Sequence, residues 1–105
     1  MKNLQAASVL ALMITASLSA ADHTIEQKDR KFSQSQIEIH VGDKLIFTNS
    51  DEVTHNVYSA TPGLEFEIKR QAPGGSSSVP FNKEGTVEVR CSIHPSMKLT
   101  VKVQK

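Results

Sequence analysis

Three side chains with metal-binding chemistry recur at every third position of the stretch CSIHPSM, namely Cys91, His94 and Met97. They offer a thiolate, an imidazole and a thioether. A thioether has little affinity for calcium, magnesium or zinc, and soft donors of this kind favour copper, above all Cu(I). Cys91 is the only cysteine of the chain, so it cannot form an internal disulfide, and a free thiol in an oxidising compartment is a liability unless it is buried or bound. These residues therefore predict a copper site.

A fourth donor is expected from elsewhere in the chain, and His55 in DEVTHNVYS is the best candidate. Two histidines and one cysteine with a weak axial methionine form the ligand arrangement of blue-copper electron-transfer sites. Other readings of single residues stay open: His55 as a surface histidine, Met97 as core packing and Cys91 as an inert buried thiol. His40 lies on the polar side of its expected strand and is interpreted as solvated surface.

Short β-strands are expected to position these donors. Ile37, Ile39 and Val41 alternate with polar residues, as in a half-buried strand. Alternation or β-rich composition predicts further strands over residues 44–49, 55–60, 64–69, 78–81, 86–91 and 98–104. With Gly/Pro turns between them, these strands predict an all-β fold, an antiparallel Greek-key β-sandwich or barrel. The donors at 91–97 then lie in a short loop between two strands, where fixed ends order the ligands before metal binds.

The N-terminal segment has the features of a secretory signal peptide. Lys2 supplies a positive charge, residues 4–18 are largely apolar, and small residues follow. The prediction is a signal peptide over residues 1–21 and one domain over residues 22–105, exported to the periplasm, or secreted where there is no outer membrane. A retained N-terminal anchor is the alternative. Because the apolar run is short, no membrane span is expected.

Charge and size narrow the class of protein. The chain has 105 residues with 12 basic and 11 acidic side chains, and removal of Lys2 leaves 11 of each. No basic patch indicates nucleic-acid binding. An exported domain of this size has a marginal core, and such domains often add disulfides or a metal.

The chain resembles the cupredoxins, the small blue copper proteins of the plastocyanin and amicyanin type. IEIHVGDKLIFTNSDEVTHNV is similar to the family's strand-turn-strand before the first ligand, and GTVEVRCSIHPSMKLTVKV to its C-terminal ligand loop, with spacing closer to amicyanin. The resemblance implies one copper ion per chain, held by His55, Cys91, His94 and Met97. Asn56 matches a family asparagine that ties the two ligand segments together. Arg90 departs from the aromatic residue common before the cysteine.

The resemblance also implies the function: a soluble type 1 copper protein, not an enzyme, that carries single electrons by Cu(II)/Cu(I) cycling. His94, beside Ile93 and Pro95, would be the electron port. The expected partners are transient redox proteins, such as a cytochrome c or a dehydrogenase, and the carrier is expected to be a monomer. Two alternatives share the ligands: a periplasmic copper-binding or delivery protein without redox turnover, and a sensory or assembly module.

Overall fold

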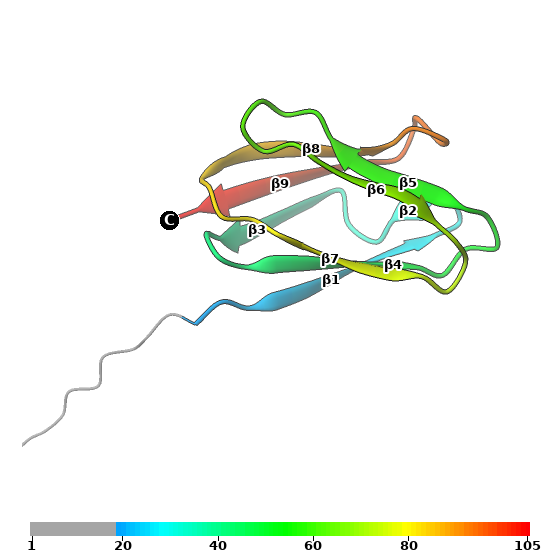
Figure 1. The fold of residues 1–105 in the computed structure, drawn as a ribbon, viewed down its shortest axis with the longest axis horizontal. Helices are drawn as coiled ribbons and strands as arrows, with labels where there is room; N and C mark the ends of the chain where they lie inside the picture. Colours follow the sequence, from blue (N-terminus) through cyan, green and yellow to red (C-terminus); the bar gives the residue numbers. More distant parts are fainter. Residues whose placement is uncertain (1–18) are drawn as a thin grey trace, which may run out of the picture.

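The computed structural model describes residues 19–105, which form two β-sheets packed face to face (Figure 1). The first sheet has the strand order β2-β1-β4-β7, with β2 (Lys31–Phe32), β1 (Asp22–Lys28), β4 (Lys44–Asn49) and β7 (Ser76–Pro80). The second has the order β3-β9-β8-β5-β6, with β3 (Gln36–His40), β9 (Lys98–Gln104), β8 (Gly85–Cys91), β5 (His55–Ser59) and β6 (Phe66–Gln71). Residues 19–105 contain no helix.

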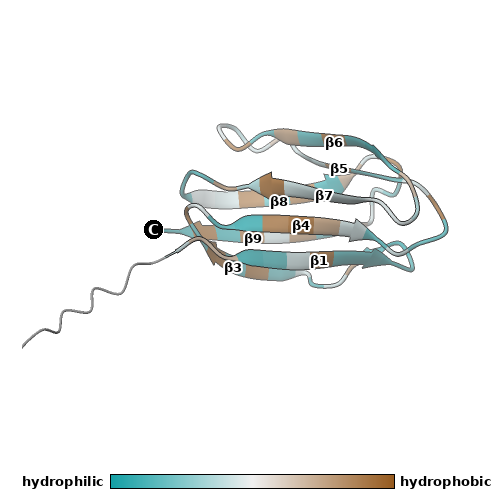
Figure 2. Ribbon diagram, turned by 60° about the horizontal axis from the view of Figure 1, so that its bottom comes forward, coloured by the Kyte–Doolittle hydropathy of each residue, from teal (hydrophilic) through white to brown (hydrophobic). Residues whose placement is uncertain are grey.

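Alternating side chains of the strands build the core between the sheets. Val87 and Val89 of β8 and Leu99 and Val101 of β9 are fully buried, and polar residues separate them along each strand. The hydropathy colours of Figure 2 change along the strands accordingly. Across the core, Phe47 of β4 in the first sheet stacks on Phe66 of β6 in the second, with ring centroids 6.2 Å apart. Burial of such large apolar side chains is the main stabilisation available to a small domain.

The predicted all-β sandwich is confirmed, but not every strand pair is antiparallel. β1 pairs with β4 in parallel, and β3 pairs with β9 in parallel. The reason is that the chain passes from β1 in the first sheet to β3 in the second before it returns as β4 beside β1. Parallel neighbours need such a crossover connection, which a hairpin cannot supply.

β1 and β2 were not among the strands that the sequence predicts. The inward positions of β1 include Ile25 and Gln27, both with 0% exposure. A glutamine at a buried position removes the apolar alternation by which a half-buried strand is recognised. His40, in contrast, is exposed on β3 as expected.

Most of the predicted signal peptide, residues 1–18, lies outside the described residues. In the part of the chain that the structure does describe, no helix is long and apolar enough to cross a membrane.

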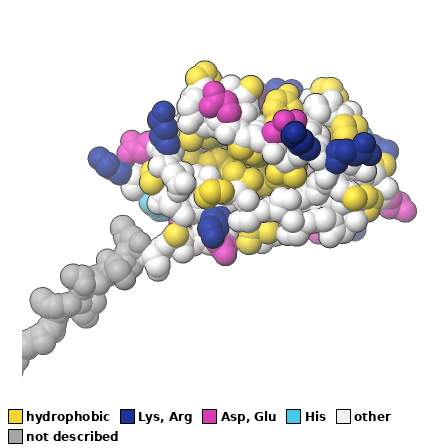
Figure 3. All heavy atoms as spheres, in the orientation of Figure 1, with side chains coloured by type: hydrophobic (Ala, Val, Ile, Leu, Met, Phe, Trp, Pro, Cys, Tyr) yellow, Lys and Arg dark blue, Asp and Glu magenta, His cyan; other side chains and the backbone are white. Residues whose placement is uncertain are grey.

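On the face seen in Figure 3, hydrophobic side chains show in a hollow between the edge strands β6 and β7, where Leu64, Phe66 and Phe81 line a pocket.

Candidate metal centre

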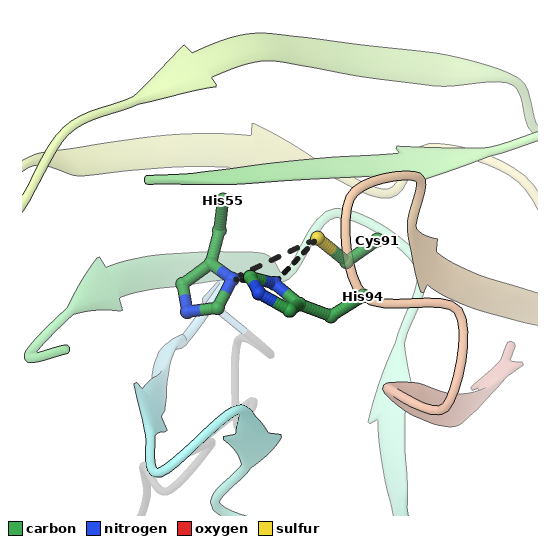
Figure 4. Close-up of side chains that lie close together, drawn as sticks. All are labelled: His55, Cys91 and His94. Carbon is green, nitrogen blue, oxygen red and sulfur yellow. Dashed lines mark hydrogen bonds between the residues drawn. The ribbon is translucent and has the colours of Figure 1, made fainter. Parts of the chain in front are cut away.

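The predicted ligands come from strand ends at one end of the sandwich. His55 is the first residue of β5 and Cys91 is the last residue of β8. These strands are antiparallel neighbours, with Val57 opposite Cys91, so the start of one lies beside the end of the other. His94 lies in the loop that leads from β8 to β9. Figure 4 shows the two imidazole rings and the sulfur of Cys91 facing one another.

The structure brings three predicted donors into one cluster, with all their ligand atoms within 4.8 Å of one another. Nδ1 of His55 lies 3.1 Å from Nδ1 of His94, and Sγ of Cys91 lies 3.7 Å and 3.9 Å from these two nitrogens. Three donors placed about 2.0–2.3 Å around one ion are roughly 3.5–4 Å apart. The observed triangle therefore has the dimensions of a small metal site.

Most of the site is buried. His55, Cys91 and Met97 are exposed by 0%, 1% and 2%, whereas His94 is only partly buried. Met97 ends the loop. Its backbone N–H donates to the carbonyl oxygen of His94 at 3.0 Å, and its side chain belongs to the same hydrophobic core cluster as Cys91. The thioether thus lies inside the molecule, and the outer edge of the site is formed by His94.

Asp51 fixes the orientation of His55. Its Oδ2 lies 2.7 Å from Nε2 of His55. Burial raises the pKa of the Asp51 carboxyl, but hydrogen bonds from His55 and from the backbone of Arg30 and Asp29 outweigh it, so the pKa is lowered. An ionised carboxylate only accepts, so Nε2 carries the proton and Nδ1 presents its lone pair to the cluster. Metal-binding histidines are usually oriented in this way.

Asp51 is itself held in place by the tight turn between β1 and β2. The backbone N–H groups of Asp29 and Arg30 donate to its two carboxylate oxygens at 2.6 Å and 2.9 Å. Both residues have positive φ, 52° and 56°, a conformation that is unfavourable for residues other than glycine. Because the carboxylate accepts from both strained residues, the turn, Asp51 and His55 form one continuous hydrogen-bonded unit.

His94 is kept in the neutral form that binds metals. Its burial lowers the pKa of the imidazole, and the neighbouring His55 and Arg30 lower it further. The ordinary pKa of 6.5 is already below neutral pH. Deprotonation therefore leaves a ring nitrogen free to coordinate at pH 7.

Asn56 ties the two ligand segments together, as the resemblance implied. Its side-chain oxygen accepts a hydrogen bond of 3.0 Å from the hydroxyl of Ser92, and its backbone N–H points at Sγ of Cys91 at 3.4 Å. The side-chain amide of Asn56 also donates to the carbonyl oxygen of Lys69 at 2.6 Å. A single residue beside His55 thus supports both the start of the ligand loop and the sulfur.

Sequence reasoning missed Asp51. An acidic residue in a polar loop is expected to be solvent-exposed, and Asp51 lies four positions before His55. The signal that could have identified it is the acid placed shortly before a candidate ligand at a loop-to-strand junction. Its side chain is in fact 10% exposed.

The donor chemistry fits copper. One thiol, two imidazoles with free lone pairs and a buried thioether make a soft set, and the hydrophobic core behind Cys91 and Met97 excludes water from one side. No carboxylate belongs to the cluster of three donors. A calcium or magnesium ion would require oxygen ligands, which this cluster does not offer.

Comparison with protein families agrees with this site. Residues 19–104 match the model of copper-binding proteins of the plastocyanin/azurin family. The chain is 32% identical over 77 residues to amicyanin-alpha of Methylorubrum extorquens, covering 70% of this chain and 65% of that protein. It is 29% identical over 101 residues to the methylamine utilization protein MauL of Methylophilus methylotrophus, covering 93% of this chain and 58% of that one. The chain thus spans less than two thirds of the length of either curated relative.

Solved structures show the same fold. A purple cupredoxin from Nitrosopumilus maritimus superposes with a TM-score of 0.70 at 26% identity, covering 78% of this chain and 99% of that one. A reduced amicyanin mutant superposes with a TM-score of 0.72 at 22% identity, covering 85% of this chain and 86% of that one. The family match spans nearly all the described residues, and the soft-donor cluster lies within it. The chain belongs to the plastocyanin/azurin family of copper-binding proteins.

Proposed function

We propose that this chain is a single-electron carrier whose copper ion is bound by His55, Cys91, His94 and Met97. The observation that carries the proposal is the convergence of three donor atoms within 4.8 Å on a buried scaffold, with Nδ1 of His55 turned toward the cluster by Asp51. When bound, copper supplies a Cu(II)/Cu(I) couple that takes up and returns one electron. The protein is proposed to be a carrier and not an enzyme.

The residues of the chain would keep this electron transfer fast by moving little. His55 and Cys91 sit on paired strands, so their spacing is fixed by the sheet. Asp51 and Asn56 hold the ring and the sulfur by hydrogen bonds. A site that keeps one geometry in both redox states requires little reorganisation when an electron arrives or leaves.

The route for the electron is proposed to pass through His94. It is the most exposed of the four proposed ligands, and its neighbour Ile93 is 50% exposed. An apolar rim around a half-buried imidazole suits a small, short-lived redox interface. One relative is named for methylamine utilization. This supports a search for redox partners among amine dehydrogenases and cytochromes c.

Export belongs to the same proposal. Residues 1–21 are proposed to be a signal peptide that directs the domain over residues 22–105, as a monomer, to the periplasm. The apolar run and small residues at its end support this reading.

The test is cyclic voltammetry of the purified, copper-loaded protein in the presence of a strong Cu(I) chelator. A carrier gives a reversible one-electron wave that survives many cycles, because copper stays bound in both states. Loss of the wave as the chelator removes Cu(I) would contradict the carrier role and favour copper delivery.

A further inference from the structure

Arg90 is the residue next to Cys91, and it reaches across the ligand loop. Its Nη2 donates to the carbonyl oxygen of Pro95 at 2.7 Å, and its Nη1 donates to Oε1 of Glu88 at 3.2 Å. Pro95 stands directly after His94 in the second half of the loop. The guanidinium therefore joins the end of β8, where Cys91 lies, to the part of the loop between His94 and Met97.

The loop has few other supports at this place. Ser92 binds Asn56 at the start of the loop, and the N–H of Met97 binds the carbonyl of His94 inside it. Ile93, Pro95 and Ser96 are exposed, so burial does not hold them. Among the hydrogen bonds of the described residues, the one from Arg90 to Pro95 links the outer half of the loop to a strand.

The position of Arg90 is electrostatically unfavourable. It lies directly opposite Lys98 in the pairing of β8 with β9, and like charges at opposed positions are destabilising. Glu88 offsets this cost by accepting from Arg90 with one carboxylate oxygen and from Lys98 with the other, at 3.2 Å and 3.3 Å. The Nε of Arg90 is also buried and has no acceptor among the described residues, which adds a further cost.

We propose that Arg90 is a positioning residue of the metal centre, which holds Pro95 so that His94 and Met97 keep one position in both redox states. This inference rests on the proposed function. A charge-assisted hydrogen bond is short and strong, as the distance of 2.7 Å indicates. A lysine at position 90 cannot fully replace the arginine, because an ammonium group lacks the planar fork that lets Arg90 reach Pro95 and Glu88 together.

The first experiment needs no metal. Amide hydrogen exchange is measured by NMR on the copper-free protein, with the N–H of Met97 as probe, because its bond to His94 closes the loop. We expect Arg90→Gln to speed this exchange about ten-fold, which corresponds to losing a hydrogen bond with a charged donor. Arg90→Lys should restore part of the protection.

Lys98→Gln is the matched control, because it removes the other cation on Glu88 and leaves the bond to Pro95 in place. In Lys98→Gln we expect the N–H of Met97 to exchange at the wild-type rate. Unchanged exchange in Arg90→Gln, or equal acceleration in Lys98→Gln, would overturn the proposal, since the loop would then not depend on Arg90 or would respond only to net charge.

The second experiment uses the copper-loaded protein and compares electron self-exchange and copper loss to a chelator. Loss of a residue that binds a metal ligand typically lowers metal affinity or activity by about 10- to 100-fold. Arg90 acts one contact further away, through Pro95, so we expect Arg90→Gln to lower copper affinity and the self-exchange rate by about ten-fold. Wild-type protein without a reversible redox couple would refute the carrier role, whereas the exchange result on copper-free protein tests the role of Arg90 in the loop by itself.

Discussion

His55 and His94 offer the same ring nitrogen to the cluster from opposite surroundings. His55 is 0% exposed, starts a strand and donates the N–H of its Nε2 to Asp51. His94 lies in an exposed loop and is only partly buried. The two rings still come within 4.9 Å of each other, centroid to centroid. One histidine is thus built into the scaffold, and the other closes the site at the surface.

The difference shows how the site can be both rigid and accessible. Strand pairing and the largely covered carboxylate of Asp51 fix the inner half before any metal binds. The outer half is held by hydrogen bonds to a short loop, where the imidazole edge can meet a partner. If this division is correct, changes to the inner half should damage folding and binding, and changes to the outer half should mainly alter binding and electron transfer.

Removal of each histidine gives the largest expected effect. His55→Ala removes the hydrogen bond from the imidazole to Asp51 and opens a buried cavity. We therefore expect a loss of about 3 kcal/mol in the free energy of unfolding and no copper-dependent colour. His94→Gly should cost about 1 kcal/mol or less. Added imidazole should restore the visible band only in His94→Gly. Urea unfolding measures the stability and absorption spectra measure the rescue. Equal rescue of the two variants would show that the two histidines do not differ in this way.

Neutralising Asp51 tests the inner half more finely. Asp51→Asn removes the ionised acceptor that holds the proton on Nε2 of His55, so we expect copper affinity to fall by roughly 10- to 100-fold. Competition with a copper chelator measures the affinity, and ¹⁵N NMR of the copper-free protein reports the tautomer of His55. The control is Glu52→Gln, which changes the exposed neighbour. The same affinity in both variants would remove Asp51 from the site.

Asp43, a buried carboxylate in the turn before β4, lies outside the donor cluster. Hydrogen bonds from the backbone of His40 and Ala21 and from the His23 side chain lower the pKa of Asp43 from 3.8 to about 2. A lowered pKa in the folded state contributes stability above pH 3.8, which is lost as the pH falls toward 2. We expect about 2 kcal/mol from this group at pH 7. This value applies to a chain that keeps Ala21; the proposed mature domain over residues 22–105 lacks the N–H of Ala21, so its contribution is expected to be smaller.

Urea unfolding of copper-free wild type and Asp43→Asn measures this contribution. The two should differ at pH 7 and converge near pH 2, with unchanged copper affinity because Asp43 is remote from the cluster. Asp22→Asn, at the exposed first position of β1, is the control. A difference between wild type and Asp43→Asn that does not change with pH would refute the explanation.

The smallest effect on stability is expected at Ile93. Its side chain is 50% exposed beside His94, so Ile93→Ser should change the free energy of unfolding by no more than about 0.5 kcal/mol. Electron self-exchange should nevertheless slow, because apolar contact between two docked copies is reduced. NMR line broadening in mixtures of oxidised and reduced protein measures the rate. An unchanged rate would place the electron port elsewhere.

The sequence predicted the parts of this molecule that local patterns encode. Strands such as β8 and β9 alternate strictly and were located correctly, and the spacing of Cys91, His94 and Met97 indicated one loop. β1 could not be recognised, because Gln27 occupies a buried position. The parallel pairing of β1 with β4 depends on which sheet each strand joins, which no local pattern records.

Hydrogen-bond partners that are distant along the chain could not be predicted from the sequence either. Asp51 and the strained turn at Asp29 and Arg30 are distant along the chain and meet only in the fold. Arg90 stood out because it departs from the aromatic residue expected there, but its hydrogen bond to Pro95 requires the loop to fold back over β8. The ligand types and the supporting Asn56 were therefore predictable, whereas the roles of Asp51 and Arg90 were not.

The most direct measurement is a visible absorption spectrum of the purified protein after addition of Cu(II), beside Cys91→Ser as control. We expect an intense band that vanishes on reduction, returns on oxidation and is absent from the serine variant, since it requires a copper–thiolate bond at Cys91. A wild-type protein that binds copper without such a band, or a band that persists in Cys91→Ser, would contradict the proposed blue-copper centre.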